Sequence, residues 1–214
     1  MSLMKKKNNR PPIFWQKAKK ILSTKDKKLS KLIESYPNDF LFSKSDPFFT
    51  LARSIVGQQI SVKAAQSVWN KLEIKIVKIN PLVISNTHFN TLKSVGLSRQ
   101  KVSYLKNLAK AFNEKKIKIS LWKEMDDEEI IQDLVQVKGI GRWTAEMFLI
   151  FNLCREDILP LDDIGMIKGL CKLYNISYPT NTEDIVKIAE KWRPYRSVAT
   201  WYLWRSLDPI PVEY

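Results

Sequence analysis

Three short stretches of this 214-residue chain carry side chains that could act on a ligand. One is the acidic pair Asp162-Asp163, which stands directly before an apolar segment. Another is a Gly-Ile-Gly turn at residues 139–141, and the last is the amide pair Gln58-Gln59. Carboxylates suit acid–base and electrostatic catalysis, whereas glycine turns expose backbone N–H groups that can bind anions.

The acidic pair has two interpretations. Asp162 or Asp163 can cap a helix that begins at Ile164, because an Asp side chain accepts hydrogen bonds from the free N–H groups of a first helical turn. One of them could instead stabilise a developing positive charge and orient or deprotonate a water molecule during hydrolysis. Adjacent aspartates are common as helix caps, so the residues alone leave both interpretations open.

The glycine turn separates two expected helices. Residues 126–136 have an acidic first turn and apolar side chains at helical spacing, which predicts one helix. Residues 142–153 are apolar on nearly every side and predict a buried central helix. The start of this second helix, flanked by Lys138 and Arg142, is suited to one backbone phosphate. A plain pair of helices with no ligand at the turn is the alternative.

Composition favours a polyanionic partner. The chain has 36 Lys plus Arg against 22 Asp plus Glu, a formal net charge of +14, so nucleic acid is the first candidate. A basic helical interaction protein with a solvated lysine-rich surface is the alternative. Two Cys and one His cannot supply the four thiolates of an iron–sulfur cluster. No apolar run approaches the ~20 residues of a membrane span, so we expect a soluble, intracellular protein with no membrane contact.

Capping residues and periodicity predict an all-α fold of about ten helices. Asp46-Pro47 and Ser61 each suit a helix start, and Ser98 suits the start of an amphipathic helix that runs to about residue 115. The lone His88 is expected at the surface. Residues 1–10 are expected to form a disordered basic tail, followed by a helical domain over residues 11–214.

Longer motifs carry a family resemblance. The string Leu-x-x-Val-x-Gly-Ile-Gly-x-x-Thr-Ala at residues 134–145 resembles the hairpin of the helix-hairpin-helix (HhH-GPD) base-excision DNA glycosylases. Pro-Leu-Asp-Asp-Ile-Gly at residues 160–165 resembles the segment that carries their catalytic aspartate. Residues 55–64 resemble the alkylpurine branch of these enzymes. Trp143, in an otherwise intact Gly-Ile-Gly-Arg-Trp-Thr-Ala string at residues 139–145, resembles the 3-methyladenine DNA glycosylase II type.

This resemblance implies two helical lobes with the active cleft between them. Lobe A would comprise about residues 11–45 plus 160–214, and lobe B about residues 46–159, with the hairpin at 126–153. The implied activity is that of a monofunctional DNA glycosylase, which flips and hydrolytically excises alkylated purines such as 3-methyladenine. It would leave an abasic site in base excision repair. A glycosylase for deaminated or oxidised bases is one alternative, and a non-catalytic helix-hairpin-helix DNA-binding module is another.

The family pattern also assigns roles to residues. It selects Asp163 as the catalyst and leaves Asp162 to cap the helix. Members that also cleave the strand carry a Lys before Thr144 as a Schiff-base nucleophile, whereas this chain has Trp143. The side chain that fills the gap left by the flipped base would be Gln59, with Gln58 as the second candidate.

The remaining implied residues bind the base or the DNA backbone. A cationic purine ring stacks well on aromatic faces, and Met147 stands where some members have Tyr. The implied base pocket contains Trp143, Met147, Trp201 and Trp204. The implied phosphate-binding residues are Lys138, Gly139, Gly141, Arg142, Thr144, Ser98 and Lys101.

The reaction requires no cofactor, and no iron–sulfur cluster is expected. The carbonyls of Val135, Val137 and Ile140 could hold Na+ or K+, as such hairpins often do. The expected partner is double-stranded DNA that contains damaged bases, bound by a monomer. The expected location is the cytoplasm or the nucleoid, or the nucleus in a eukaryote.

Overall fold

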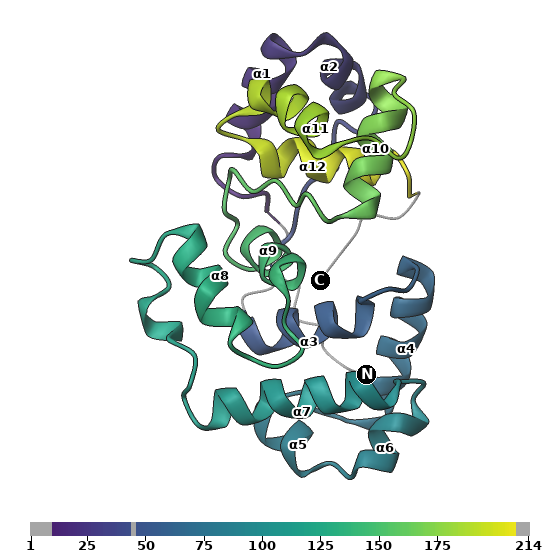
Figure 1. The fold of residues 1–214 in the computed structure, drawn as a ribbon, viewed down its shortest axis with the longest axis vertical. Coiled ribbons are helices and arrows are strands. Elements are labelled where there is room, and N and C mark those ends of the chain that lie inside the picture. The colour runs from purple at the N-terminus through teal and green to yellow at the C-terminus, as the bar shows by residue number, and fades with distance from the viewer. Residues whose placement is uncertain (1–9, 44–45, 209–214) are drawn as a thin grey trace. The chain divides into compact units, whose positions relative to one another are not determined.

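The computed structural model describes residues 10–43 and 46–208, so nearly all of the expected basic tail lies outside the described residues. The described chain contains helices and no strand, which confirms the predicted all-α fold (Figure 1). It divides into two compact units, one of residues 10–43 and 154–208 and the other of residues 46–153. The segment 154–159, which the sequence placed with the hairpin, groups with the first unit. There the N–H of Ile158 donates to Oγ of Ser197 at 2.9 Å.

The first unit is built from both ends of the chain. Its elements are α1 (Trp15–Lys25), α2 (Lys27–Glu34), α10 (Ile164–Tyr174), α11 (Thr182–Ala189), the short 3-10 helix η2 (Glu190–Trp192) and α12 (Arg196–Arg205). Helices α1 and α2 pack on α12, and the rings of Trp15 and Trp201 meet edge to face at 5.3 Å. Gly169 lets α10 approach α12 closely, because a Cβ there would lie 2.8 Å from the carbonyl oxygen of Leu203.

Asp26 joins the two halves of this unit. Its Oδ1 caps α2, and its Oδ2 accepts hydrogen bonds from the Tyr174 hydroxyl and from Nε1 of Trp192 at 3.2 Å. The same oxygen pairs with Nζ of Lys191 at 2.9 Å. Burial raises the pKa of this carboxyl, but the hydrogen bonds, that from Tyr174 foremost, outweigh burial and lower the pKa to about 2.

The second unit comprises α3 (Pro47–Gly57), α4 (Val62–Lys75), α5 (Pro81–Asn86), α6 (Phe89–Ser94), α7 (Arg99–Asn113), the 3-10 helix η1 (Ile119–Leu121), α8 (Asp127–Val135) and α9 (Arg142–Phe151). It is organised around α3, which packs against α4, α7 and α9. The predicted caps Asp46, Ser61 and Ser98 each accept the backbone N–H three residues ahead, which confirms three predicted helix starts. Every residue of α9 from Thr144 to Phe151 is buried, as predicted for the central helix.

Two smaller expectations can be compared with this fold. His88 is exposed and caps α6, where its Nδ1 accepts the N–H of Asn90 at 3.2 Å. Within residues 10–43 and 46–208, no helix is both long enough and apolar enough to cross a membrane.

Candidate active site and nucleic-acid interface

Asp163 is the N-cap of α10 in the first unit. Its Oδ1 accepts the N–H of Met166 at 2.5 Å and the indole N–H of Trp204, from α12, at 2.7 Å. The residue is only 9% exposed, so the two donors fix one carboxylate oxygen in a largely dry setting. The expectation that Asp162 caps the helix was wrong: Asp162 is exposed, and Asp163 accepts the N–H of the first turn.

Gly165 makes the contact between Asp163 and Trp204 possible. A Cβ at this position would lie 3.1 Å from Oδ1 of Asp163 and 3.2 Å from Cδ1 of Trp204. These separations are tighter than ordinary van der Waals contact, so a side chain would press on both partners. No local pattern predicts this pairing, because 41 residues separate the aspartate from the tryptophan.

The second predicted site is the hairpin between α8 and α9 in the second unit (Figure 1). Gly139 has φ of +110°, and a Cβ there would lie 2.3 Å from Cγ of Tyr104, so both the backbone and the neighbour require glycine. Gly141, in contrast, has φ of −95°, and a Cβ there would meet nothing within 4 Å, so neither its backbone nor its surroundings require glycine. The start of α9 therefore opens onto free space, where its N–H groups can approach an anion.

The two basic residues that flank the hairpin differ in availability. Lys138 is exposed and lies beside the turn. Arg142 is already engaged: its guanidinium bonds both carboxylate oxygens of Glu128 at 3.0 and 2.8 Å and reaches Oε1 of Glu146 at 3.1 Å. These carboxylates therefore neutralise the positive charge of Arg142, which was predicted to bind a phosphate. The hydrogen bonds that Arg142 donates to Glu128 lower the pKa of Glu128 and raise the pKa of Arg142.

The amide pair occupies the loop between α3 and α4. Gln59 is exposed and has φ of +58°, an unusual conformation for a residue with a side chain. Gln58 is turned inward, and its Nε2 donates to the carbonyl of Gly139 at 2.9 Å and to Oγ1 of Thr144 at 3.0 Å. Thr144 was predicted to bind phosphate, but its side chain is 1% exposed, and its hydroxyl accepts a hydrogen bond from Gln58 inside the unit.

Six of the residues predicted to meet DNA line one polar groove of about 330 Å³ in the second unit. The groove lies between the N-terminus of α7, the N-terminus of α9 and the loop that carries Gln59. Lys101 donates from Nζ to the carbonyl of Val56 at 2.7 Å, and burial lowers its pKa. The sequence did not identify Gln100 and Tyr104, which also line the groove. The predicted six are Gln58, Gln59, Ser98, Lys101, Gly139 and Gly141.

The four side chains predicted for the base pocket lie in different settings. Trp143 is half-buried, and Trp204 holds Asp163 as described. Trp201 packs edge-on against Trp15 and Tyr202 in the core of the first unit and is 2% exposed, so the prediction that it lines a pocket was wrong. Met147, on α9, has no exposed surface, so its side chain packs in the interior of the second unit and does not line a pocket for a base.

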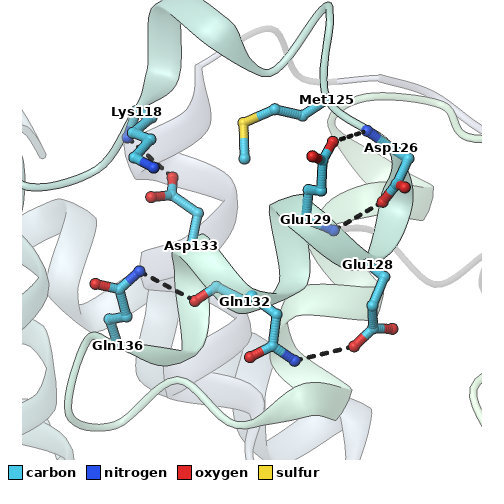
Figure 2. A pocket seen from close by; sticks show the side chains of 8 residues that line it. All are labelled: Lys118, Met125, Asp126, Glu128, Glu129, Gln132, Asp133 and Gln136. Atoms are coloured by element: carbon cyan, nitrogen blue, oxygen red, sulfur yellow. Dashed lines mark hydrogen bonds between the residues drawn. The ribbon is translucent and has the colours of Figure 1, made fainter.

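An acidic hollow of about 410 Å³ lies along α8 (Figure 2). Its carboxylates are already bonded: Asp126 and Glu129 form a capping box, and Asp133 accepts from the Lys118 N–H at 2.9 Å. Glu128, on the same helix, binds Gln132 and Arg142. The negative charge of this hollow disfavours a polyanion, so the groove beside Gln59 is the better candidate for DNA contact.

The hairpin carbonyls have the donor chemistry of an alkali-cation site. Val137 accepts the N–H of Ile140 at 2.9 Å, which leaves one of its two oxygen lone pairs. Rings of backbone carbonyls suit Na+ or K+, so the donor set fits, and the cation stays a prediction. Within the described residues no group of three or more His, Cys, Asp or Glu side chains could hold a metal ion, and both Cys154 and Cys171 are free thiols.

Comparison with known proteins decides the family. The HhH-GPD superfamily of base excision DNA repair proteins matches residues 52–194, a span that includes Gln59, the hairpin and Asp163. The chain belongs to the HhH-GPD superfamily. This membership confirms the resemblance that the motifs indicated. Trp204 lies outside the matched residues.

Individual relatives of this HhH-GPD protein cover most of its length. DNA-3-methyladenine glycosylase 1 of Schizosaccharomyces pombe is 34% identical over 84% of this chain and 81% of its own. The alkylbase DNA glycosidase-like protein mag2 of the same organism is 32% identical over 89% and 93%. The solved structure of S. pombe 3-methyladenine DNA glycosylase (Mag1) with abasic DNA is 33% identical, with a TM-score of 0.80 over 89% of this chain and 96% of that one.

Proposed function

We propose that this protein is a monofunctional DNA glycosylase that flips alkylated purines such as 3-methyladenine out of double-stranded DNA and excises them by hydrolysis. The observation that carries the proposal is the carboxylate of Asp163, held at the start of α10 by Trp204 and Met166 in a member of the HhH-GPD superfamily. The relatives named for 3-methyladenine glycosylase activity support the substrate class.

The chemistry suits a single carboxylate. As the N-glycosidic bond lengthens, the sugar gains oxocarbenium character, and a fixed negative charge stabilises it. Water then forms the new bond at C1′ and loses a proton to Asp163 or to solvent, while the bonding electrons leave with the purine. Because an alkylated purine starts as a cation and leaves neutral, its departure requires no general acid. The two hydrogen bonds to Oδ1 orient the carboxylate before the substrate binds.

The groove of the second unit is suited to the DNA backbone. Two helix N-termini, those of α7 and α9, open into it, and the start of α9 at Gly141 has open space around it. Exposed Lys138 adds positive charge beside the hairpin. Gln59, exposed on the adjoining loop, is the side chain proposed to fill the space left by the flipped base. An alkali cation on the hairpin carbonyls would add positive charge next to a bound phosphate.

Base selection is proposed to depend on Trp143. It is the half-buried aromatic of the predicted pocket, whereas Trp201 and Met147 are core residues. A cationic purine stacks on an electron-rich indole, which favours alkylated purines over neutral bases. The same Trp stands where strand-cleaving relatives carry Lys, so this protein is proposed to leave an abasic site intact. Action on chromosomal DNA would place it in the compartment that holds that DNA.

The test measures base release from methylated duplex DNA, with abasic sites then revealed by alkali. Wild type should release 3-methyladenine, Asp163→Asn should release none while still binding DNA, and Asp162→Asn should act like wild type. Borohydride should trap no covalent complex with abasic DNA. Turnover by Asp163→Asn would move the catalyst elsewhere. DNA binding without release of alkylated, deaminated or oxidised bases would leave a binding module.

A further inference from the structure

Gln58 and Gln59 are neighbours in sequence with opposite orientations. Gln59 is exposed, whereas Gln58 sends both donor hydrogens of its amide toward the hairpin. The acceptors are the carbonyl of Gly139, at 2.9 Å, and the hydroxyl of Thr144, at 3.0 Å. A single side chain therefore joins the loop after α3 to both the turn and the first turn of α9, more than 80 residues further along the chain.

The other contacts of these two segments leave little freedom at the joint. Gly139 is backed by the ring of Tyr104, which occupies the space where a Cβ would lie. On the other side, the end of α3 is held by Lys101, whose Nζ bonds the carbonyl of Val56. Gln59 follows directly with φ of +58°, a conformation that persists only when neighbouring contacts hold it.

We propose that Gln58 is a positioning residue that couples the side chain inserted into DNA, Gln59, to the hairpin that binds the backbone phosphate. This inference rests on the proposed function. In the free protein, Gln58 already joins the loop that carries Gln59 to the hairpin. When the hairpin binds a phosphate, Gln59 is therefore brought to a fixed place in the duplex. The loop loses its conformational entropy when the protein folds, so base flipping does not have to order it.

The coupling predicts a specific dependence on the state of the target base. A loosened loop slows the extrusion of a stacked, paired base, because Gln59 then enters the duplex in many orientations. A base that is already unpaired does not need the insertion. Loss of Gln58 should therefore reduce excision from paired sites far more than excision from sites where the lesion lies opposite an abasic analogue.

The test compares Gln58→Met, which keeps the length but removes both donors, with Gln132→Met, an exposed residue that loses one amide hydrogen bond to Glu128. Single-turnover excision by Gln58→Met should fall about 10- to 100-fold for a paired lesion and less than about threefold for the unpaired one. Gln132→Met should match wild type on both. Thr144→Val, which removes one acceptor and keeps the side-chain shape, should give a smaller loss of the same pattern.

A double-mutant cycle separates coupling from a merely structural role. If Gln58 acts through Gln59, then Gln59→Ala and the double variant Gln58→Met/Gln59→Ala should excise the paired base at the same rate. Additive losses, or an equal loss on paired and unpaired lesions, would overturn the proposal. 2-Aminopurine next to the target base reports flipping separately, and Gln58→Met should lower its fluorescence gain on binding.

The same fluorescence distinguishes failure of the coupling from failure of the proposed function. If wild type releases no base, the proposed glycosylase activity fails, and the cycle is then read from the fluorescence gain alone. An unchanged gain in folded Gln58→Met, with its melting temperature as the check on folding, would overturn the coupling whatever the activity.

Discussion

The indole N–H of Trp204 lies 2.7 Å from Oδ1 of Asp163 and donates a hydrogen bond to it. The two residues come from α12 and α10, and Gly165 provides the space in which they meet. Trp204 therefore serves the proposed reaction by orienting the carboxylate, a role different from that of a stacking surface.

Trp204→Phe should keep an aromatic side chain at this position and remove the hydrogen-bond donor. A hydrogen bond to a charged group contributes about 1.5–3 kcal/mol, so single-turnover excision should fall roughly 10- to 100-fold while the Kd for DNA stays unchanged. Trp69→Phe is the control, because the buried indole N–H of Trp69 has no hydrogen-bond partner within the described chain. An unchanged rate for Trp204→Phe would show that the donor does not contribute to catalysis.

Gly165→Ala and Gly169→Ala should separate activity from stability along one helix. A methyl group at Gly165 presses on Asp163 and Trp204, so excision should fall about 10-fold or more. At Gly169 it meets the backbone of Leu203, so the main result should be a loss of about 1–3 kcal/mol in unfolding free energy. Excision rates and urea melts of both variants check the contrast, and the reverse pattern would refute it.

Asp26 should make the first unit acid-sensitive. Its pKa is about 2 when folded against a usual value of 3.8, so its ionised form stabilises the fold above about pH 4. That contribution, about 2 kcal/mol, is lost as the pH falls from about 4 to about 2. Asp26→Asn should be less stable at pH 7 and should show a flatter stability profile below pH 4. Thermal melts across this range, with exposed Asp162→Asn as control, provide the measurement.

Glu128→Gln should tighten DNA binding. The substitution removes the negative charge that binds both terminal nitrogens of Arg142, at 3.0 and 2.8 Å, while Nε stays bonded to Glu146. The terminal nitrogens of this guanidinium, beside the hairpin, then become available to a phosphate. The slope of log K against log salt should steepen by about 1, with a few-fold gain in affinity at low salt. Glu124→Gln makes the same charge change at another exposed residue and should cause a smaller change in both the salt slope and the affinity. Equal effects of the two variants would mean that only net charge matters.

Helix starts and the central hairpin were predictable because their causes are local. Asp46, Ser61 and Ser98 each accept a hydrogen bond from the N–H three residues ahead. The residues of α9 are apolar on nearly every side, which predicts a buried helix. The contacts that build the sites were not predictable. Trp204 reaches Asp163 across 41 residues, and Tyr104 requires a glycine 35 residues away. Neither pairing leaves a periodic signal in the chain.

Some predicted site residues have a suitable side chain that is not available to a ligand. Arg142 has the right charge for a phosphate, but Glu128 and Glu146 already bind it. Thr144 and Trp201 have the right chemistry for their predicted roles and lie inside the units. The cap at α10 depends on which of two aspartates faces the helix N-terminus, a matter of backbone geometry that composition does not encode.

The division of the first unit between the two ends of the chain also determines when it can fold. The partners of Asp26 on the C-terminal side, Tyr174 and Trp192, leave the ribosome roughly 150 residues after it does. During synthesis, α1 and α2 therefore wait without their packing partners while the second unit, continuous in sequence, completes its own core. Only a finished chain can close the unit that holds Asp163, so a prematurely terminated chain retains the groove and lacks the carboxylate's support.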